Sequence, residues 1–201
     1  MLRRHLAATL SAALAAAVIV SAHGGATAAP QAIPLRADTL TPVDVALAFG
    51  TTDGRDTVTI KRTPTAPDTD HPTFARIKGV TFLNGTIEMS VRSHDATPQP
   101  RGFIGLAFRI NDDNSRYESF YLRPGNGRID DQVRRNHTLQ YYAFPEFPFS
   151  TLRSTSPEKY ESHADIGLDE WIRVKVIVNG TDARLFINDA PNPSLVVTDL
   201  K

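Results

Sequence analysis

The chain has 201 residues, a formal net charge of 0 at pH 7 and no cysteine. The lack of cysteine excludes disulfides, thiol catalysis, cysteine-ligated metals and a lipid anchor on cysteine. The balanced charge offers no excess of the basic residues that nucleic acids or anionic membranes attract, so neither is expected as a partner.

The first 28 residues have the pattern of a secretory signal peptide. Two arginines precede an alanine-rich apolar run at residues 6–22, and Ala26-Thr27-Ala28 supplies the small residues of a cleavage site. We predict cleavage near Ala28 and a secreted or periplasmic protein, in which 20 basic and 22 acidic residues leave a net charge of −2. An uncleaved anchor is the alternative, but the run is slightly shorter than the roughly 20 residues of a spanning helix, so we expect no stable membrane anchor.

Residues 29–42 carry three prolines and no clear period, which predicts a linker or irregular lead-in. Residues 43–201 read as one domain of short strands separated by turns. Asn-Gly pairs at 84–85 and 179–180 are strong hairpin signals, because both positions tolerate positive φ. The pattern predicts an all-β sandwich or barrel. Besides the two strands in residues 102–124, the predicted strands are 43–49, 57–62, 74–83, 86–92, 171–178, 183–187 and 195–200.

Residues 102–124, GFIGLAFRINDDNSRYESFYLRP, are the most informative segment. They read as two strands around a polar turn, and side chains alternate faces along a strand. Phe120 and Leu122 then share an apolar face with the large residues of the first strand, whereas Tyr121 and Arg123 lie on the opposite face. Aromatic rings beside planar charged donors suit sugars, which offer apolar C–H faces and hydroxyl edges.

The strand rhythm breaks between residues 126 and 165. This loop-rich insert combines polar residues with five aromatic residues at positions 141–149 and prolines at 145 and 148. A long loop on a rigid sandwich is where binding is expected, provided that it lies over the polar sheet face.

The order GxxFRxxDxxxYExFYLRP, RRNHTLQYY, DEWIRVKVIVNGTDARLFIND and PSLVVTDLK resembles the concanavalin A-like lectin/glucanase superfamily. Residues 74–201 look most like bacterial secreted 3-keto-disaccharide hydrolase-like domains, also described as glycoside hydrolase family 16-like or laminin G-like. The resemblance implies two antiparallel sheets in a jelly roll, with a concave, ligand-binding sheet. This fold hosts both binding modules and enzymes.

Two departures from the family pattern matter. The glucanase signature Glu-x-Asp-x-Glu is missing, because no Glu-x-Asp occurs in the chain. The pattern also usually continues past Lys201 into a strand of the form GxVGLW. The chain is then either a fragment or a sandwich that lacks a final strand and leaves an open edge, which invites pairing with another chain.

The candidate ligand-binding residues are Arg109, Tyr121, Arg123, Gln140 and Tyr142. Tyrosine stacks on a pyranose and guanidinium groups hold hydroxyls or a carboxylate. The alternative is a solvated outer face on which the arginine stems cover apolar surface.

The candidate catalytic residues are Asp130, Asp131, Glu118 and His137, which supply the only acid–base group that can be assembled. Glycoside hydrolysis usually needs two carboxyl groups about 5–10 Å apart. Residues 111–115 (NDDNS) offer oxygens for Ca²⁺, but they lack the glycine and terminal glutamate of an EF-hand loop, and a polar hairpin turn explains them. We therefore predict no metal site and no cofactor.

Three functions remain open at this point. The first is binding of an oligosaccharide or polysaccharide without catalysis, and the second is hydrolysis of a glycoside, of the 3-keto type if the family name applies. The third is a structural or adhesive module whose open sheet edge pairs with a partner.

Overall fold

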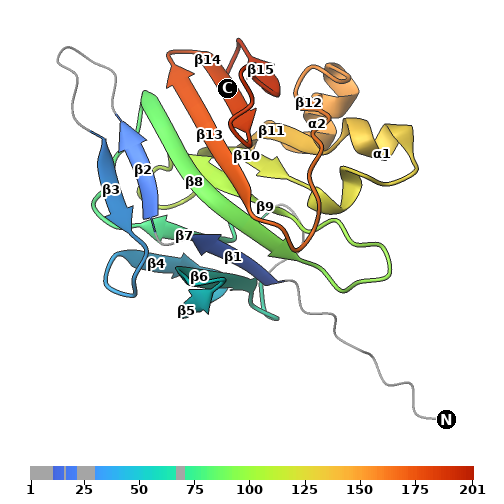
Figure 1. Cartoon of the computed structure of the whole chain (residues 1–201). Coiled ribbons are helices and arrows are strands. Elements are labelled where there is room, and N and C mark those ends of the chain that lie inside the picture. The colour runs from blue at the N-terminus through green and yellow to red at the C-terminus, as the bar shows by residue number, and fades with distance from the viewer. Residues whose placement is uncertain (1–10, 16, 22–29, 67–70) are drawn as a thin grey trace.

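The computed structural model describes residues 11–15, 17–21, 30–66 and 71–201. They form two antiparallel sheets that pack face to face, a further two-stranded sheet and three short helical segments (Figure 1). The all-β sandwich predicted from the sequence is therefore confirmed. The jelly-roll order of its strands stays a prediction.

The larger sheet has nine strands in the described part of the chain. They are β1 (Ser11–Ala15), β2 (Ala17–Ser21), β3 (Gln31–Pro34), β5 (Val45–Thr52), β6 (Arg55–Arg62), β8 (Gly85–His94), β13 (Ile172–Asn179), β14 (Asp182–Ile187) and β15 (Leu195–Val197). Seven of them run in the order β15-β14-β13-β8-β1-β6-β5, and β2 pairs with both β8 and β3.

The smaller sheet has four strands in the order β12-β11-β10-β9. Their bounds are Ile104–Phe108 for β9, Tyr117–Leu122 for β10, Leu139–Phe144 for β11 and Glu161–Ser162 for β12. The two-stranded sheet pairs β4 (Leu40–Val43) with β7 (Phe74–Ile77). The helical segments are η1 (Pro124–Asn126), α1 (Gln132–Asn136) and α2 (Phe149–Thr155), and Figure 1 shows α1 and α2 beside the smaller sheet.

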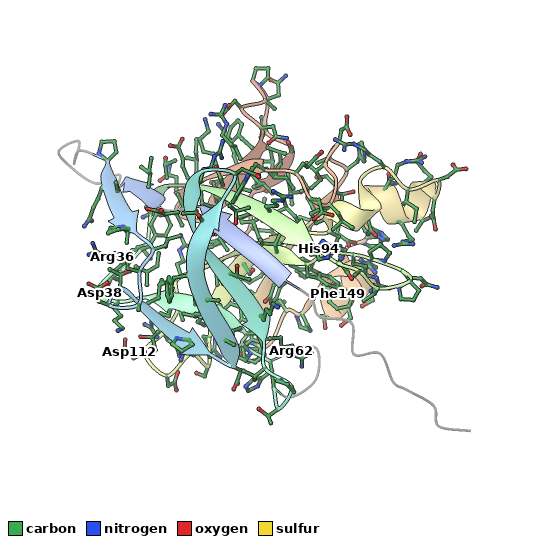
Figure 2. All side chains as sticks on the ribbon, turned by 60° about the horizontal axis from the view of Figure 1, so that its bottom comes forward. Arg36, Asp38, Arg62, His94, Asp112 and Phe149 are labelled. Atoms are coloured by element: carbon green, nitrogen blue, oxygen red, sulfur yellow. The ribbon has the colours of Figure 1, made fainter. Side chains whose placement is uncertain are left out.

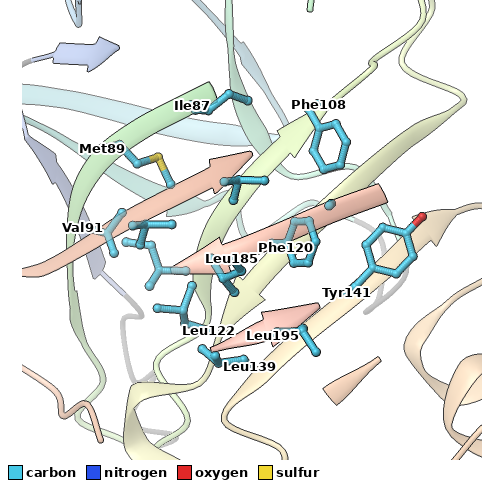
Figure 3. Packing of buried hydrophobic residues seen from close by; sticks show 14 of the residues in the cluster. Ile87, Met89, Val91, Phe108, Phe120, Leu122, Leu139, Tyr141, Leu185 and Leu195 are labelled. Carbon is cyan, nitrogen blue, oxygen red and sulfur yellow. The ribbon is translucent and has the colours of Figure 1, made fainter. Parts of the chain in front are cut away.

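The core fills the space between the two sheets. Strand β13, IRVKVIVN, alternates buried and more exposed residues along its length, as a strand with one covered face should. Its buried valines belong to one apolar cluster with Phe120, Leu122 and Leu139 of the smaller sheet, which are fully buried and are labelled in Figure 3. The face predicted for Phe120 and Leu122 is confirmed, because both side chains are fully buried in this core.

Only one of the two predicted Asn-Gly hairpins forms. Gly180 has a φ of +60° and joins β13 to β14, as expected. The turn at Asn84 does not join neighbouring strands, because β7 ends at Ile77 and pairs with β4 instead of β8. Asn84 uses its side-chain oxygen to accept a hydrogen bond from Gly180 N at 2.7 Å, so it braces the other turn.

The amino-terminal segments take part in the larger sheet. Residues 11–15 and 17–21, which lie within the predicted signal peptide, form β1 and β2. The predicted cleavage point at Ala28 lies outside the described residues. The described part of the predicted lead-in at residues 29–42 is not irregular throughout, because it contains β3 and most of β4.

Candidate functional site

The outer face of the smaller sheet is polar and yet buried. Arg123 directly follows β10, and its backbone N–H donates to Thr138 O at 2.7 Å, which continues the pairing of β10 with β11. The Arg123 residue is only 4% exposed, Gln140 on β11 is fully buried, and Glu161 on β12 is 5% exposed. Polar groups are rarely buried to this degree unless they bond to one another.

The guanidinium of Arg123 is held by neighbours from two strands and a loop. Its Nη1 donates to His137 O at 2.6 Å, and its Nη2 donates to the Tyr121 hydroxyl at 2.6 Å and to Gln140 Oε1 at 3.4 Å. The carboxylate of Glu161 lies 3.7 Å away. Desolvation by burial lowers the pKa of Arg123, and the charges of Tyr121 and Glu161 oppose that effect.

Three aromatic rings surround the same guanidinium. The Arg123 Cζ lies 4.7 Å from the ring centroid of Tyr121, 5.7 Å from that of Phe103 and 5.8 Å from that of Phe149. These distances are within the range of cation–π attraction, which is stronger where water is excluded. Phe149, labelled in Figure 2, is the first residue of α2, so the helix brings a ring over the sheet.

Glu161 supplies the negative charge on the outer face of the smaller sheet, next to Arg123 and Arg153. Both of its oxygens contact the guanidinium of Arg153 on α2, one of them 2.9 Å from Nε, and its Oε2 lies 3.6 Å from His137 Nε2. These hydrogen bonds raise the pKa of Arg153. Desolvation lowers the pKa of His137 below 6.5, although the charge of Glu161 opposes this shift. Phe103, Tyr121, Arg123, His137, Gln140, Phe149, Arg153 and Glu161 are called the Arg123 cluster below.

Glycine is required where β9 passes beneath the cluster. Gly105 pairs with Tyr121, and a Cβ at Gly105 would lie 2.2 Å from Phe120 O and 2.6 Å from Tyr121 Cα. Both atoms belong to the backbone of β10 and cannot rotate away. Because Gly105 has no side chain, β9 and β10 approach closely and the Tyr121 ring has room to lie against Phe103, with ring centroids 5.7 Å apart.

A buried carboxylate holds the loop that carries Phe103. The two oxygens of Asp95 accept hydrogen bonds from the backbone N–H groups of Thr97, Arg101 and Gly102 at 2.8–3.0 Å. Desolvation raises the pKa of this carboxyl, but the hydrogen bonds outweigh it and hold the pKa below 3.8. Phe103 is thereby fixed with its ring 41% exposed at the edge of the cluster.

Four residues predicted from the sequence meet in the Arg123 cluster, namely Tyr121, Arg123, Gln140 and His137. A fifth, Tyr142, borders it, since its ring packs edge-on against Tyr121 at 5.5 Å and its hydroxyl lies 3.0 Å from that of Tyr117. The alternation predicted for residues 102–124 thus places Tyr121 and Arg123 on this outer face, and Gln140, His137 and Tyr142 lie next to them.

Arg109 lies elsewhere, contrary to the expectation that it shares the face of Tyr121. It follows the end of β9 with a φ of +51°, so the alternation of the strand no longer sets its direction. Its guanidinium donates to Glu118 Oε1 at 2.8 Å, to Leu83 O at 2.9 Å and to Gly180 O at 2.6 Å. Arg109 thus ties the smaller sheet to turns at the end of the larger one.

The three predicted catalytic acids do not come together. Glu118 points into the core, where Oε2 accepts a hydrogen bond from Tyr141 at 2.6 Å. Asp131 caps α1 by accepting from Arg134 N at 3.0 Å, and Asp130 is fully exposed with Arg135 4.0 Å away. The predicted acid–base group is therefore not assembled, and of its members only His137 lies in the Arg123 cluster.

In the 111–115 loop, the guanidinium of Arg76 binds oxygens that the sequence analysis weighed as Ca²⁺ ligands. Arg76 on β7 donates from Nη1 to Asn111 O and to Asn114 Oδ1, both at 2.8 Å, and to Asp112 O at 3.2 Å. Three oxygens of this loop, two from the backbone and one from the Asn114 side chain, are therefore bound to a guanidinium. Among the described residues, no group of three or more histidine, aspartate or glutamate side chains is placed to hold a metal.

Sequence reasoning missed Phe103, Phe149, Arg153 and Glu161. Glu161 lies on a strand of only two residues, and Phe149 and Arg153 lie on a helix of seven. Segments this short carry no usable periodicity. The available signal was the gathering of aromatic and charged residues in the 126–165 insert, which indicated the segment without the individual residues.

No protein-family model, no curated protein and no solved structure matches this chain. The class that the coordinates define is an all-β sandwich with a buried polar cluster on one sheet face. The resemblance to the concanavalin A-like superfamily stays a prediction. Within the part of the chain that the structure describes, no helix is long and apolar enough to cross a membrane.

Proposed function

We propose that this protein binds an oligosaccharide or polysaccharide at the Arg123 cluster. The observation that carries the proposal is the guanidinium of Arg123, which lies among three aromatic rings and is held by Glu161 and Gln140. Rigid aromatic rings next to fixed hydrogen-bonding groups suit a sugar, because one ring face packs on C–H groups while the polar groups fix the hydroxyls.

The accessible part of the cluster would make the contacts. Phe103 exposes 41% of its surface and the side chain of Arg153 exposes 36%, whereas Arg123 and Glu161 are buried beneath them. Phe103 would serve as the stacking platform, and the buried ion pairs would keep the platform in place. We retain secretion or export to the periplasm as part of this proposal, which would give the protein access to external glycans.

Titration calorimetry against neutral and acidic oligosaccharides, with and without Ca²⁺, tests the proposal. Phe103→Ala should weaken binding at least about fivefold, because a lost stacking contact costs on the order of 1–3 kcal/mol. Phe49→Ala is the matched control, since Phe49 is similarly exposed at 45% but lies on β5 of the larger sheet. No affinity for any sugar, or an equal loss in both variants, would overturn the proposal.

Hydrolysis of a glycoside, of the 3-keto type if the family name applies, is the second candidate. It is favoured by His137, whose lowered pKa leaves it neutral at pH 7 and able to accept a proton 3.6 Å from Glu161. Glu161 would act as a positioning residue, because Arg153 engages both of its oxygens. Product release that His137→Gln abolishes, while Asp130→Asn and Asp131→Asn preserve it, would establish this mechanism; no turnover on any glycoside would exclude it.

A further inference from the structure

Strands β8 and β6 are joined only through β1 in the described part of the larger sheet. Residues of β1 pair with β8 on one side, from Ser11↔His94 to Leu14↔Val91, and with β6 on the other, from Ala12↔Ile60 to Ala15↔Thr57. Strand β2 continues along β8, with Ile19 opposite Glu88. The space that residues 11–15 fill between β8 and β6, together with the space that residues 17–21 fill along β8, is called the β8–β6 slot below.

The slot needs a strand to fill it, because the backbone edges of β8 and β6 border it on two sides. Without residues 11–21, the edge of β8 that faces away from β13 and the inner edge of β6 would both lose their hydrogen-bond partners. Unpaired strand edges are costly when buried and attract other strands when exposed. Figure 2 shows β1 lying alongside the β5–β6 hairpin, which depends on this strand for its place in the sheet.

Side chains of the surrounding strands set the distance between β8 and the β5–β6 hairpin, which is the width of one strand. Asp53, in the turn between β5 and β6, accepts hydrogen bonds from Arg92 of β8 at 2.6 Å and from Trp171 Nε1 at 3.0 Å. These contacts reach past β1 and hold the hairpin one strand away from β8. Val58 and Val91, the two backbone partners of Leu14, are fully buried, so position 14 lies in line with the core.

We propose that the β8–β6 slot is a strand-docking site whose occupant is residues 11–21 of this chain, and that the protein retains this segment even after the chain is cut behind it. The segment reads SAALA and AVIVS on either side of Ala16, so the site takes an extended strand without charge, made of alanine and branched aliphatic residues between two serines. Binding by added strands draws its affinity from backbone hydrogen bonds and its specificity from alternate side chains. A cut near Ala28 would then leave a bound strand, not an empty edge.

The test uses the full chain with a protease site inserted between residues 22 and 28. After cutting of the folded protein, native mass spectrometry should find the amino-terminal fragment still bound. Leu14→Asp should release it at least about tenfold faster than Ala13→Asp, because only position 14 lies in line with the buried valines. Release of the fragment on cutting, with the unfolding midpoint of the remaining chain unchanged, would overturn the proposal.

A cross-link tests the register before any cut is made. The chain has no native cysteine, so Ala13→Cys with Thr59→Cys should give one intramolecular disulfide across neighbouring strands. Ala13→Cys with Arg184→Cys is the control, since Arg184 lies on β14 beyond β8 and β13, and it should not cross-link. Equal cross-linking of both pairs, or dimerisation of the cut protein through β6 and β8 in place of the fragment, would overturn the proposed occupant.

Discussion

On the core side of the smaller sheet, Phe120 and Leu122 pack among apolar side chains, whereas on the outer side Arg123, Gln140 and Glu161 are buried to nearly the same extent. The two faces belong to the same strands and alternate residue by residue. The core face gains stability from removing apolar surface from water. The outer face has to compensate for desolvated charges with hydrogen bonds and ion pairs, and these contribute little net stability. Burial alone therefore does not distinguish a core from a site.

The largest loss of stability is expected on the core face. Phe120→Ala should lower the free energy of unfolding by about 4 kcal/mol, because the ring packs against Phe108 at 6.0 Å and Tyr141 at 5.3 Å and would leave a cavity. Chemical denaturation measures this change. A loss below about 1 kcal/mol would show that the two sheets can close over the space, and that the core face is less tightly packed than its burial indicates.

On the outer face, the stability of the fold should depend on charge, so that removing one charge without changing the side-chain volume lowers it. Glu161→Gln keeps the shape but leaves Arg123 and Arg153 without a counter-charge, so unfolding should become easier by about 3 kcal/mol. Glu146→Gln is the matched control, since Glu146 pairs with Arg116 at the exposed surface and should change stability by less than about 0.5 kcal/mol. Equal effects at the two positions would mean that the outer face is solvated.

The close approach of β9 and β10 at Gly105 affects packing on both faces of the smaller sheet. Gly105→Ala should destabilise the fold by about 2 kcal/mol, because the new Cβ would collide with the backbone of β10. Gly50→Ala on β5 meets no atom within 4 Å and should stay within about 0.5 kcal/mol of the parent. A tolerant Gly105 would indicate that the strands can separate beneath Tyr121, and urea unfolding of both variants decides this.

The smallest effect concerns the charge of His137. Its pKa is lower in the folded protein than the ordinary 6.5, so the unfolded chain binds the proton more readily. Stability is then fully present above pH 6.5, decreases as the pH falls below this value and levels off below the folded pKa. Histidine ring NMR should show the lowered pKa, and His137→Gln should remove this part of the pH dependence. A His137 titration at or above pH 6.5 would contradict the description of the cluster.

The sequence predicted the alternation of the smaller sheet because its strands are long enough to show it. The shared face of Tyr121 and Arg123 followed from this rule. Arg109 did not, since its positive φ ends the regular strand one residue after Phe108. Alternation applies only while the backbone stays extended, and a single left-handed residue redirects the side chain.

Two further pairings of the larger and two-stranded sheets were not expected from the sequence, and both are between segments far apart in the chain. Asn84-Gly85 has the residues of a hairpin turn, but β7 finds its partner in β4, far earlier in the chain. Residues 11–15 and 17–21 show no strand alternation in the sequence, and they pair with β6 and β8. Local composition does not reveal which edges elsewhere need a partner, so these pairings could not be predicted.

The turn at residues 111–115 is held by an arginine from another strand, Arg76 of β7. The loop between β9 and β10 gathers carbonyl and amide oxygens around one positive charge, and that charge belongs to Arg76, thirty-five positions away from Asn111. The chain therefore carries its own counter-ion for the loop. The positive charge that organises the turn of this hairpin is therefore inherited with the sequence.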